Sequence, residues 1–248
     1  PISENEMISA SFAEETGSAE ENIPEKEFTI TTNKVKVVFT NKGGDIVSYK
    51  LLKHKDKETG DGVEMATNIT GSNRAFSTAF GGFDGDVLND TFNVSMKDSR
   101  TILFYRDYEV KDSSGVPHKF TFGKRYSFDE NDYAFKLEIS ILSKESGNNL
   151  DFSGSAYTLR TSPQIGPKFD KKNRYEVRQF LALNGAKKIR KNVADKVYEM
   201  DALEWAGVGG KYFTMLVKPV APLTMNSSVK SISKSGSDEN TQVVLSRK

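Results

Sequence analysis

In residues 133–142, YAFKLEISIL, apolar side chains alternate with polar or small ones up to Ile141. In an extended strand, successive side chains point to opposite faces, so the apolar set shares one face and the polar set shares the other. One face of this strand is therefore predicted to be buried and the other to be wet. The apolar set is Tyr133, Phe135, Leu137, Ile139 and Ile141, and the polar set is Lys136, Glu138 and Ser140.

Short runs rich in β-branched and aromatic residues recur along the chain, and turn signals rich in Gly, Asn and Asp separate them. Many strands with one dry face each need a second sheet to pack against, so we expect an all-β fold, a large antiparallel two-sheet sandwich. No fixed repeat period indicates a propeller. Helix is expected only as a short piece within 179–196, where Gly185 limits its length. The expected strands include 28–32, 35–40, 45–52, 101–110, 118–128, 196–200, 211–219, 228–233 and 241–245.

Charge divides the chain into two parts. Residues 1–27 hold eight Glu and one Lys, a net of −7 in a chain whose total is +1, which leaves +8 for residues 28–248. We interpret 1–27 as an acidic flexible spacer, because so polar a stretch buries too little apolar area to offset its ordering entropy. Residues 28–248 are interpreted as a single domain. Its basic excess is interpreted as solvated Lys-rich strand edges rather than a nucleic-acid or membrane surface.

Composition narrows the chemistry. The 248 residues contain no cysteine, which excludes thiol catalysis and thiolate metal sites. No stretch approaches eighteen apolar residues in a row, and the start has neither the basic end nor the apolar run of a signal peptide. Because the sequence also lacks an initiator Met, we expect it to be a domain excised from a larger protein that holds the membrane or export signals.

Candidate catalytic and metal-binding residues are few. His54 and His118 have neither a second His nor a carboxylate at metal-ligand spacing, and we expect both at the surface. The acidic stretch 83–90 lacks the ligand order and the final Glu of a calcium loop, and a tight Asp-Gly turn is the better interpretation. GVGGK at 207–211 lacks the first Gly and the Ser/Thr of a phosphate-binding loop. We therefore predict no catalytic residue, metal ion or cofactor.

The stretch 205–219, WAGVGGKYFTMLVKP, contains the only tryptophan. Its glycines Gly207, Gly209 and Gly210 are expected to allow positive φ and a close backbone approach, so that the chain turns sharply into a strand that carries Tyr212 and Phe213. Trp205 is expected to cover the open end of the sandwich core behind that turn.

Three blocks in order resemble the large extracytoplasmic domain of YidC-type bacterial membrane protein insertases. The first is TNKGGDIVSYKL at 40–51, with Gly43 and Gly44 in an early turn. The second is KRYSFD at 124–129, with Tyr126, followed by the long alternating strand. The third is WAGVGGKYF at 205–213, which runs into an apolar strand ending at Pro219. Order and spacing agree over residues 28–219.

The resemblance implies a β-supersandwich, similar in fold to sugar mutarotases, that faces the periplasm from the bacterial inner membrane. It implies that 1–27 follows a first transmembrane helix, and that the groove performing insertion lies in a bundle outside this sequence. It also implies partners, namely the SecD–SecF part of the translocon and nascent membrane proteins. The translocon contact would map to roughly residues 144–180, including Tyr157, Phe169 and Tyr175.

Two other functions stay open. A carbohydrate-active enzyme of mutarotase type would place His54 or His118 beside a carboxylate in a cleft, but two unsupported histidines are a poor basis for general acid–base chemistry. A glycan- or peptide-binding sandwich without an insertase connection is the other alternative. The favoured interpretation is a non-catalytic interaction domain that binds through its sheet edges or a concave sheet face.

Overall fold

The computed structural model is built almost entirely of antiparallel strands, which confirms the all-β prediction. Residues 11–13 and 15 are helical. No helix in the described part of the chain is long and apolar enough to cross a membrane. The structure describes residues 11–13, 15–16, 22–112, 114–145, 150, 152, 154–169, 173, 175–192, 196–200, 202–219, 227–232 and 240–247.

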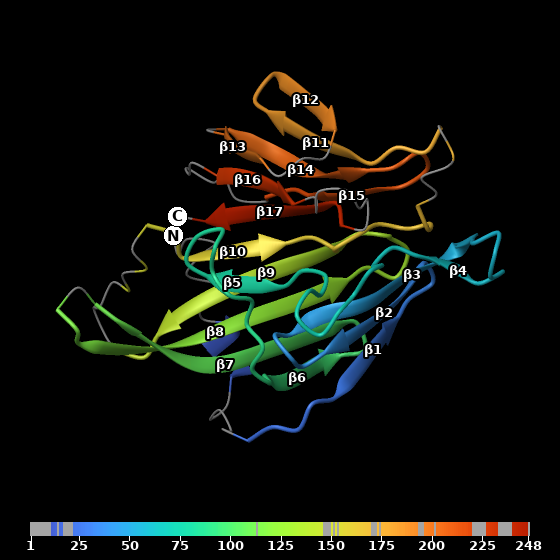
Figure 1. Cartoon of the computed structure of the whole chain (residues 1–248). Coiled ribbons are helices and arrows are strands. Elements are labelled where there is room, and N and C mark those ends of the chain that lie inside the picture. Colours follow the sequence, from blue (N-terminus) through green and yellow to red (C-terminus); the bar gives the residue numbers. More distant parts are fainter. Residues whose placement is uncertain are drawn as a thin grey trace.

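The first half of the chain forms two four-stranded sheets of sequential neighbours, drawn in blue and green in the lower part of Figure 1. Their apolar faces meet at Phe39, whose ring centroid lies 5.7 Å from that of Phe104 and 4.9 Å from that of Tyr126. One sheet contains β1 (Glu27–Thr31), β2 (Val35–Thr40), β3 (Asp45–Lys55) and β4 (Gly62–Glu64), and the other contains β6 (Asn93–Asp98), β7 (Thr101–Lys111), β8 (Pro117–Phe128) and β9 (Phe135–Ser143).

The second half, together with β5 from the first half, forms two further sheets, in which strands distant in sequence are neighbours (Figure 1). Phe180 of one sheet stacks on Tyr198 of the other at 4.9 Å between ring centroids. A five-stranded sheet has the order β13 (Lys196–Met200), β16 (Ser227–Ile232), β17 (Gln242–Arg247), β10 (Tyr157–Arg160), β5 (Thr78–Phe80), and a four-stranded sheet has the order β12 (Lys187–Asn192), β11 (Gln179–Asn184), β14 (Leu203–Gly209), β15 (Thr214–Val217).

A hairpin occupies the segment where a short helix was expected, so that prediction is wrong. β11 and β12 pair from Gln179 to Asn192, and Gly185 lies in the turn between them with a φ of +56°. Phe180 and Ala182 alternate into the core, which is the period of a strand and not of a helix.

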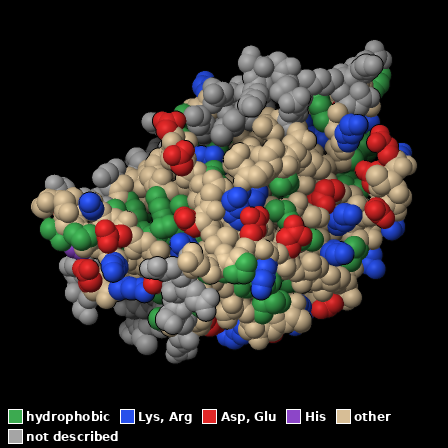
Figure 2. Space-filling model, turned by 60° about the horizontal axis from the view of Figure 1, so that its bottom comes forward, with side chains coloured by type: hydrophobic (Ala, Val, Ile, Leu, Met, Phe, Trp, Pro, Cys, Tyr) green, Lys and Arg blue, Asp and Glu red, His purple; other side chains and the backbone are tan. Residues whose placement is uncertain are grey.

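One hydrophobic cluster connects all four sheets, with buried residues from β2 and β8 as well as from β11, β14 and β17. The expected antiparallel sandwich is thus confirmed, although its strands form four separate sheets instead of two continuous ones. Isolated β-bridges add pairings outside these sheets, such as Ile46 to Ala75 and Thr67 to Gln164. On the face drawn in Figure 2, basic and acidic side chains are interspersed, as expected for solvated strand edges.

The other face of the β6–β9 sheet is less wet than the alternation in 133–142 suggests. Phe12 is 1% exposed and forms a small second cluster with Leu103 and Tyr105, against which Leu142 packs. Its ring lies where a side chain on Gly123 would be, 2.6 Å from the position of an added Cβ. Part of the segment interpreted as spacer therefore packs on the body of the protein.

Candidate functional site

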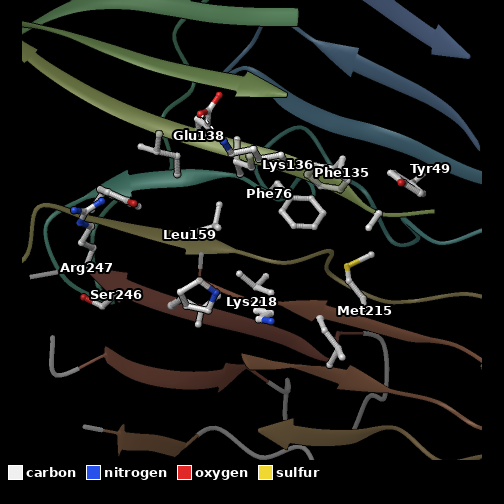
Figure 3. A pocket seen from close by; sticks show the side chains of 18 of the residues that line it. Tyr49, Phe76, Phe135, Lys136, Glu138, Leu159, Met215, Lys218, Ser246 and Arg247 are labelled. Atoms are coloured by element: carbon white, nitrogen blue, oxygen red, sulfur yellow. Dashed lines mark ion pairs between the residues drawn. The ribbon is translucent and has the colours of Figure 1, made fainter. Parts of the chain in front are cut away.

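A cavity of about 1350 Å³ lies between the two halves of the molecule, and Figure 3 shows it from close by. One wall comes from β3, from Phe76 and from all of β9 except Leu142. The other wall comes from β10, the end of β17 and the β14–β15 hairpin with the residues that follow it. Its apolar lining includes Tyr49, Leu51, Met65, Phe76, Phe135, Leu137, Ile139, Ile141, Leu159, Phe213, Met215, Val217 and Leu245.

Aromatic side chains build one end of the cavity, where Figure 3 draws Tyr49, Phe76 and Phe135 close together. The Phe135 ring lies 4.9 Å from Phe76 and 5.8 Å from Tyr49, measured between centroids. The Tyr49 hydroxyl donates to the backbone oxygen of Tyr133 at 2.6 Å. Burial, and then the charge of Asp132, raise the pKa of Tyr49 far above its ordinary value, so this hydroxyl stays a donor.

The β14–β15 hairpin forms part of the opposite wall. The Gly210 N–H donates to the Phe213 carbonyl at 2.8 Å, which closes the turn, and β14 and β15 pair from Gly209 and Thr214 onward. Met215 and Val217 then point from β15 toward the core and line the cavity. The hairpin thus brings Phe213 to the cavity, whereas Tyr212 is 67% exposed. The sequence predicts both residues within a strand, but β15 begins only at Thr214.

Charged groups in the cavity wall fall into two kinds. The Glu138 carboxylate pairs with Lys136 at 3.0 Å and with Arg125 at 3.6 Å. Lys218 and Arg247 are exposed, line the cavity, and form no ion pair with any residue that the structure describes. Figure 3 draws Arg247 near Ser246 at the end opposite Tyr49. The cavity is therefore apolar along most of its length, with two cations that its own described carboxylates leave uncompensated.

The strand β9 is the terminal strand of its sheet, and none of the described segments pairs with its other side. The Lys144 N–H donates to the Lys119 carbonyl, which sets the hydrogen-bonding phase of the β8–β9 ladder. In an antiparallel pair, residues alternate between groups that face the partner and groups that face away. The N–H and C=O groups of Phe135, Leu137, Ile139 and Ile141 therefore point to the free edge.

His54 lies in the cavity wall, exposed at the surface as predicted. Its ring contacts those of Tyr133 and Phe213 at 5.4 and 5.5 Å between centroids. Two aromatic neighbours give the imidazole an apolar contact surface, and no hydrogen bond between His54 and a described carboxylate is present.

His118 lies outside the residues that line the cavity, where it forms hydrogen bonds to Glu145 at 3.0 Å and to Asp112 at 3.1 Å. The interpretation that no carboxylate supports this histidine is therefore wrong, because Asp112 follows β7 and Glu145 follows β9, and the fold brings both acids to His118. The hydrogen bonds to Glu145 and then to Asp112 raise the pKa of His118.

Gly43, Gly44 and Tyr126, from two of the sequence blocks, meet in the interior. Both glycines have positive φ, +68° and +63°, and the Tyr126 hydroxyl donates to the Gly44 carbonyl at 3.0 Å. The next residue, Asp45, accepts from Lys124 and Arg74, and both cations are almost completely buried. The Lys124 ammonium also donates to the carbonyls of Gly43 and Phe76. We call these residues, 43–45 with Arg74, Lys124 and Tyr126, the Gly43 junction.

The glycines of the third block behave differently from the expectation. Gly207, Gly209 and Gly210 do not have positive φ, so that part of the prediction is wrong. The close approach is confirmed, because an added Cβ would lie 1.9 Å from the Met215 carbonyl at Gly207 and 2.6 Å from the Leu181 side chain at Gly209. Glycine is needed at these two positions because a Cβ atom would clash with a neighbouring strand, and not because of the backbone conformation.

Trp205 does not cover the end of the core, and that prediction is wrong. Its neighbours Ala206 and Val208 are buried in the core cluster, whereas Trp205 is only partly buried. The alternation of β14 places its side chain on the face opposite Val208, together with Gly207.

The three residues predicted for a partner contact lie in different settings. Tyr157 belongs to β10 and lines the cavity. Phe169 is half-buried beneath Arg178, whose guanidinium lies 5.0 Å from the ring centroid. Tyr175 is 62% exposed and lies 6.0 Å from the Lys211 ammonium at the tip of the hairpin. Tyr175 and Tyr212 are thus both exposed near Lys211.

In the described part of the chain, no group of three or more His, Asp and Glu side chains is arranged to hold a metal ion. The acidic stretch 83–90 begins in a turn, where the Gly85 N–H donates to the Gly82 carbonyl at 3.1 Å. Asp90 accepts from the Tyr108 hydroxyl at 3.0 Å and is engaged within the fold.

The cavity could not have been found from the sequence alone. The alternation in 133–142 identifies the apolar face of β9, but it does not show that the strand lies at the end of its sheet. Lys218, Arg247 and Leu245 reach the cavity because β17 and the end of β15 pass through distant parts of the fold.

A family model and similar known sequences indicate the same family. Residues 27–243 match the model of the family described as "YidC periplasmic domain". The chain is 41% identical over 225 residues to the membrane protein insertase YidC of Treponema denticola, covering 88% of this chain and 39% of that protein. It is 31% identical over 230 residues to the membrane protein insertase YidC of Treponema pallidum, covering 79% of this chain and 37% of that protein. The chain therefore spans less than half the length of these relatives.

Solved structures overlap with this fold at low sequence identity. A galactose mutarotase related enzyme from Lactobacillus acidophilus has a TM-score of 0.49 at 15% identity, covering 90% of this chain and 85% of that one. A galactose mutarotase-like protein from Lactobacillus casei has a TM-score of 0.48 at 8% identity, covering 90% and 87%.

Proposed function

The chain belongs to the YidC periplasmic domain family, and from this premise we propose that it serves a membrane protein insertase as a non-catalytic binding domain. The domain faces the periplasm from the bacterial inner membrane. It contacts nascent membrane proteins and the SecD–SecF part of the translocon, and assists insertion by holding segments of these proteins rather than by chemical change.

The observation that carries this proposal is the long cavity with a sheet edge in its wall. At about 1350 Å³ it exceeds the ~300–1000 Å³ of ordinary small-molecule sites. Its lining is dominated by aliphatic and aromatic side chains, and such surfaces on soluble domains mark binding sites for apolar groups. Membrane proteins in transit expose segments of this kind.

The translocon contact is proposed for the exposed aromatic and basic side chains at the hairpin tip. Tyr175 and Tyr212 are 62% and 67% exposed, and Lys211 lies over both rings. Exposed tyrosines beside a cation are typical of protein interfaces. Tyr157 and Phe169 are less accessible, so they contribute little to such a contact directly.

Site-specific photocrosslinking in the full-length insertase tests the proposal. A photoreactive residue at position 137 or 215 in the cavity should give adducts with a membrane protein caught during insertion, and one at 175 or 212 should give adducts with translocon subunits. The matched control is position 188 on β12, which is exposed and distant from the cavity lining. Adducts from position 188 equal to those from 137 and 215 would contradict the proposal.

One observation favours a second function, a carbohydrate-active enzyme. His54 lines the cavity together with Asp132 and Glu138, so an imidazole and two carboxylates share one space. The arrangement argues against it, because Asp132 accepts from the backbone N–H of Tyr133 and Ala134, and Glu138 pairs with two cations. An assay of sugar anomer exchange decides: turnover that disappears in His54→Ala would favour the enzyme.

A further inference from the structure

The free edge of β9 offers a row of backbone groups to whatever occupies the cavity. These are the N–H and C=O groups of alternate residues from Phe135 to Ile141, and the side chains of the same residues line the cavity and pack against the core. Backbone groups of this kind need hydrogen-bond partners, and burial without partners is costly. An acyl chain or another hydrocarbon supplies no hydrogen-bond partner. An extended polypeptide supplies one N–H and one C=O for each residue of β9 that faces the free edge.

Length and volume agree with a strand as the occupant. β9 is 9 residues long, which corresponds to about 30 Å at ~3.3 Å per residue. The cavity follows nearly all of it, because residues 132–141 and Ser143 are in its lining. An edge of this length is normally blunted by charge. Here the Lys136 charge is paired with Glu138 at 3.0 Å, so the edge carries little net repulsion toward an incoming strand.

The residues that line the cavity determine which side chains the added strand can carry. Leu159, Leu245 and Met215 face the cavity from the wall opposite β9, so residues directed at them are apolar. A strand alternates its side chains, which makes every second residue apolar. Lys218 and Arg247 line the same cavity without an ion pair to a described residue, and a carboxylate on the incoming strand would complement them.

We propose that an extended polypeptide segment, apolar at alternate residues and carrying a carboxylate, adds to the free edge of β9 as a fifth strand of the β6–β9 sheet. The proposal rests on the proposed function and makes it specific, since it names the mode of binding and the class of segment that is held. Main-chain hydrogen bonds provide the affinity and the apolar pockets provide the selectivity.

N-methylated peptides test the mode directly. The probe is an acetylated peptide of sequence EVTVTVTVT with a fluorescent label, and two derivatives carry N-methyl groups on the valines or on the threonines. Only one of these two sets faces β9 in an added strand. One derivative should therefore bind about tenfold or more weaker than the parent, and the other should bind like the parent.

A proline substitution tests the same edge from the side of the protein. Ile139→Pro removes an N–H that points to the free edge, whereas Ser140→Pro removes one that pairs with Gly123 in β8. Proline is tolerated in an edge strand where its N–H would face outward. Ile139→Pro should keep the circular dichroism of the fold and bind the parent peptide about tenfold weaker than Ile139→Ala, and Ser140→Pro should lower the stability of the sheet.

Charge provides a third arm. The double variant Lys218→Gln with Arg247→Gln should weaken binding of the Glu-containing peptide and leave a Gln-containing version unchanged. Equal binding of both N-methylated derivatives and the parent would overturn strand addition, as would binding of a labelled anionic lipid with no binding of any peptide. If the peptide tests failed while crosslinks from position 137 persisted in the full-length insertase, only strand addition would be refuted. Loss of those crosslinks would refute the proposed function itself.

Discussion

The Gly43 junction and the Gly207–Gly210 stretch both bring glycines to a turn beside aromatic residues, but they need glycine for different reasons. Gly43 and Gly44 have positive φ, and they lie over a buried aspartate bonded by two cations. Gly207 has ordinary φ and lies so close to the neighbouring strand that no Cβ fits. The first region is held by charge and backbone conformation, and the second by contact distance alone.

The largest effect is expected in the junction, on Lys124→Met. Burial lowers the pKa of Lys124, but Asp45 and two backbone carbonyls hold its ammonium in place. Removing the cation leaves Asp45 with Arg74 only and two carbonyls unpaired, so the free energy of unfolding should fall by about 3–5 kcal/mol. Urea denaturation, followed through the fluorescence of the single tryptophan, measures it. A loss no greater than that of Arg100→Met, which breaks an exposed pair with Glu130, would contradict the assignment.

Gly44→Ala should come next. Its Cβ would lie 2.6 Å from Phe104, and the φ of +63° is strained for alanine, so we expect a loss of about 2–4 kcal/mol. Gly60→Ala is the matched control, because Gly60 has a φ of +74° with open space around it. The control should lose only the backbone part, about 1 kcal/mol. Equal losses in the two variants would show that the contact with Phe104 does not matter.

Gly207→Ala isolates the contact without the strain. The added methyl group would push β15 away from β14. Because β15 is a terminal strand of its sheet, the free energy of unfolding should fall by only about 1–3 kcal/mol. Hydrogen exchange should accelerate mainly at Thr214–Val217 and leave the β6–β9 sheet unchanged. Uniform acceleration across both sheets would mean that the hairpin is coupled to the whole core more tightly than this comparison implies.

The smallest effect on stability is expected at His118, which forms hydrogen bonds to Glu145 and Asp112 near the surface, in contrast to the buried charges of the Gly43 junction. Because the pKa of His118 is raised in the folded protein, its contribution to stability is full below the unfolded pKa and is lost as pH rises through the folded pKa. The stability difference between the wild type and His118→Gln should therefore be largest below the unfolded pKa of about 6.5 and shrink as the pH rises above it. Thermal unfolding across this range measures it. A difference that grows with pH would contradict the assigned hydrogen bonds.

Local patterns predicted the elements of the fold but not their neighbours. The alternation in 133–142 located β9 and its apolar face, because side-chain period depends only on the strand itself. A short helix is expected within 179–196, although Phe180 and Ala182 already show a period of two. The burial of Phe12 was missed because composition describes the segment around it, whereas its binding place exists only once Gly123 lies across the sheet.

The candidate site was predictable only in part. The sequence predicts the sharp turn after Gly210 and the exposure of His54, but not that Phe213 lines a cavity. Trp205 was expected to be a core residue because tryptophan is large and apolar, but the register of β14 directs it away from the core. The cavity depends on the separation between β9 and β17, and such a separation is set by packing across the whole molecule.

The position of β17 has a consequence for synthesis on the ribosome. This strand lies between β16 and β10, so β10 has only β5 as a partner until residues 242–247 have been made. The β6–β9 sheet, in contrast, pairs consecutive strands and can form as they emerge. Until β17 arrives, Leu159 and the rest of β10 have no strand beside them on that side, which leaves apolar surface open to chaperones or to wrong pairing. Translation therefore completes the cavity last.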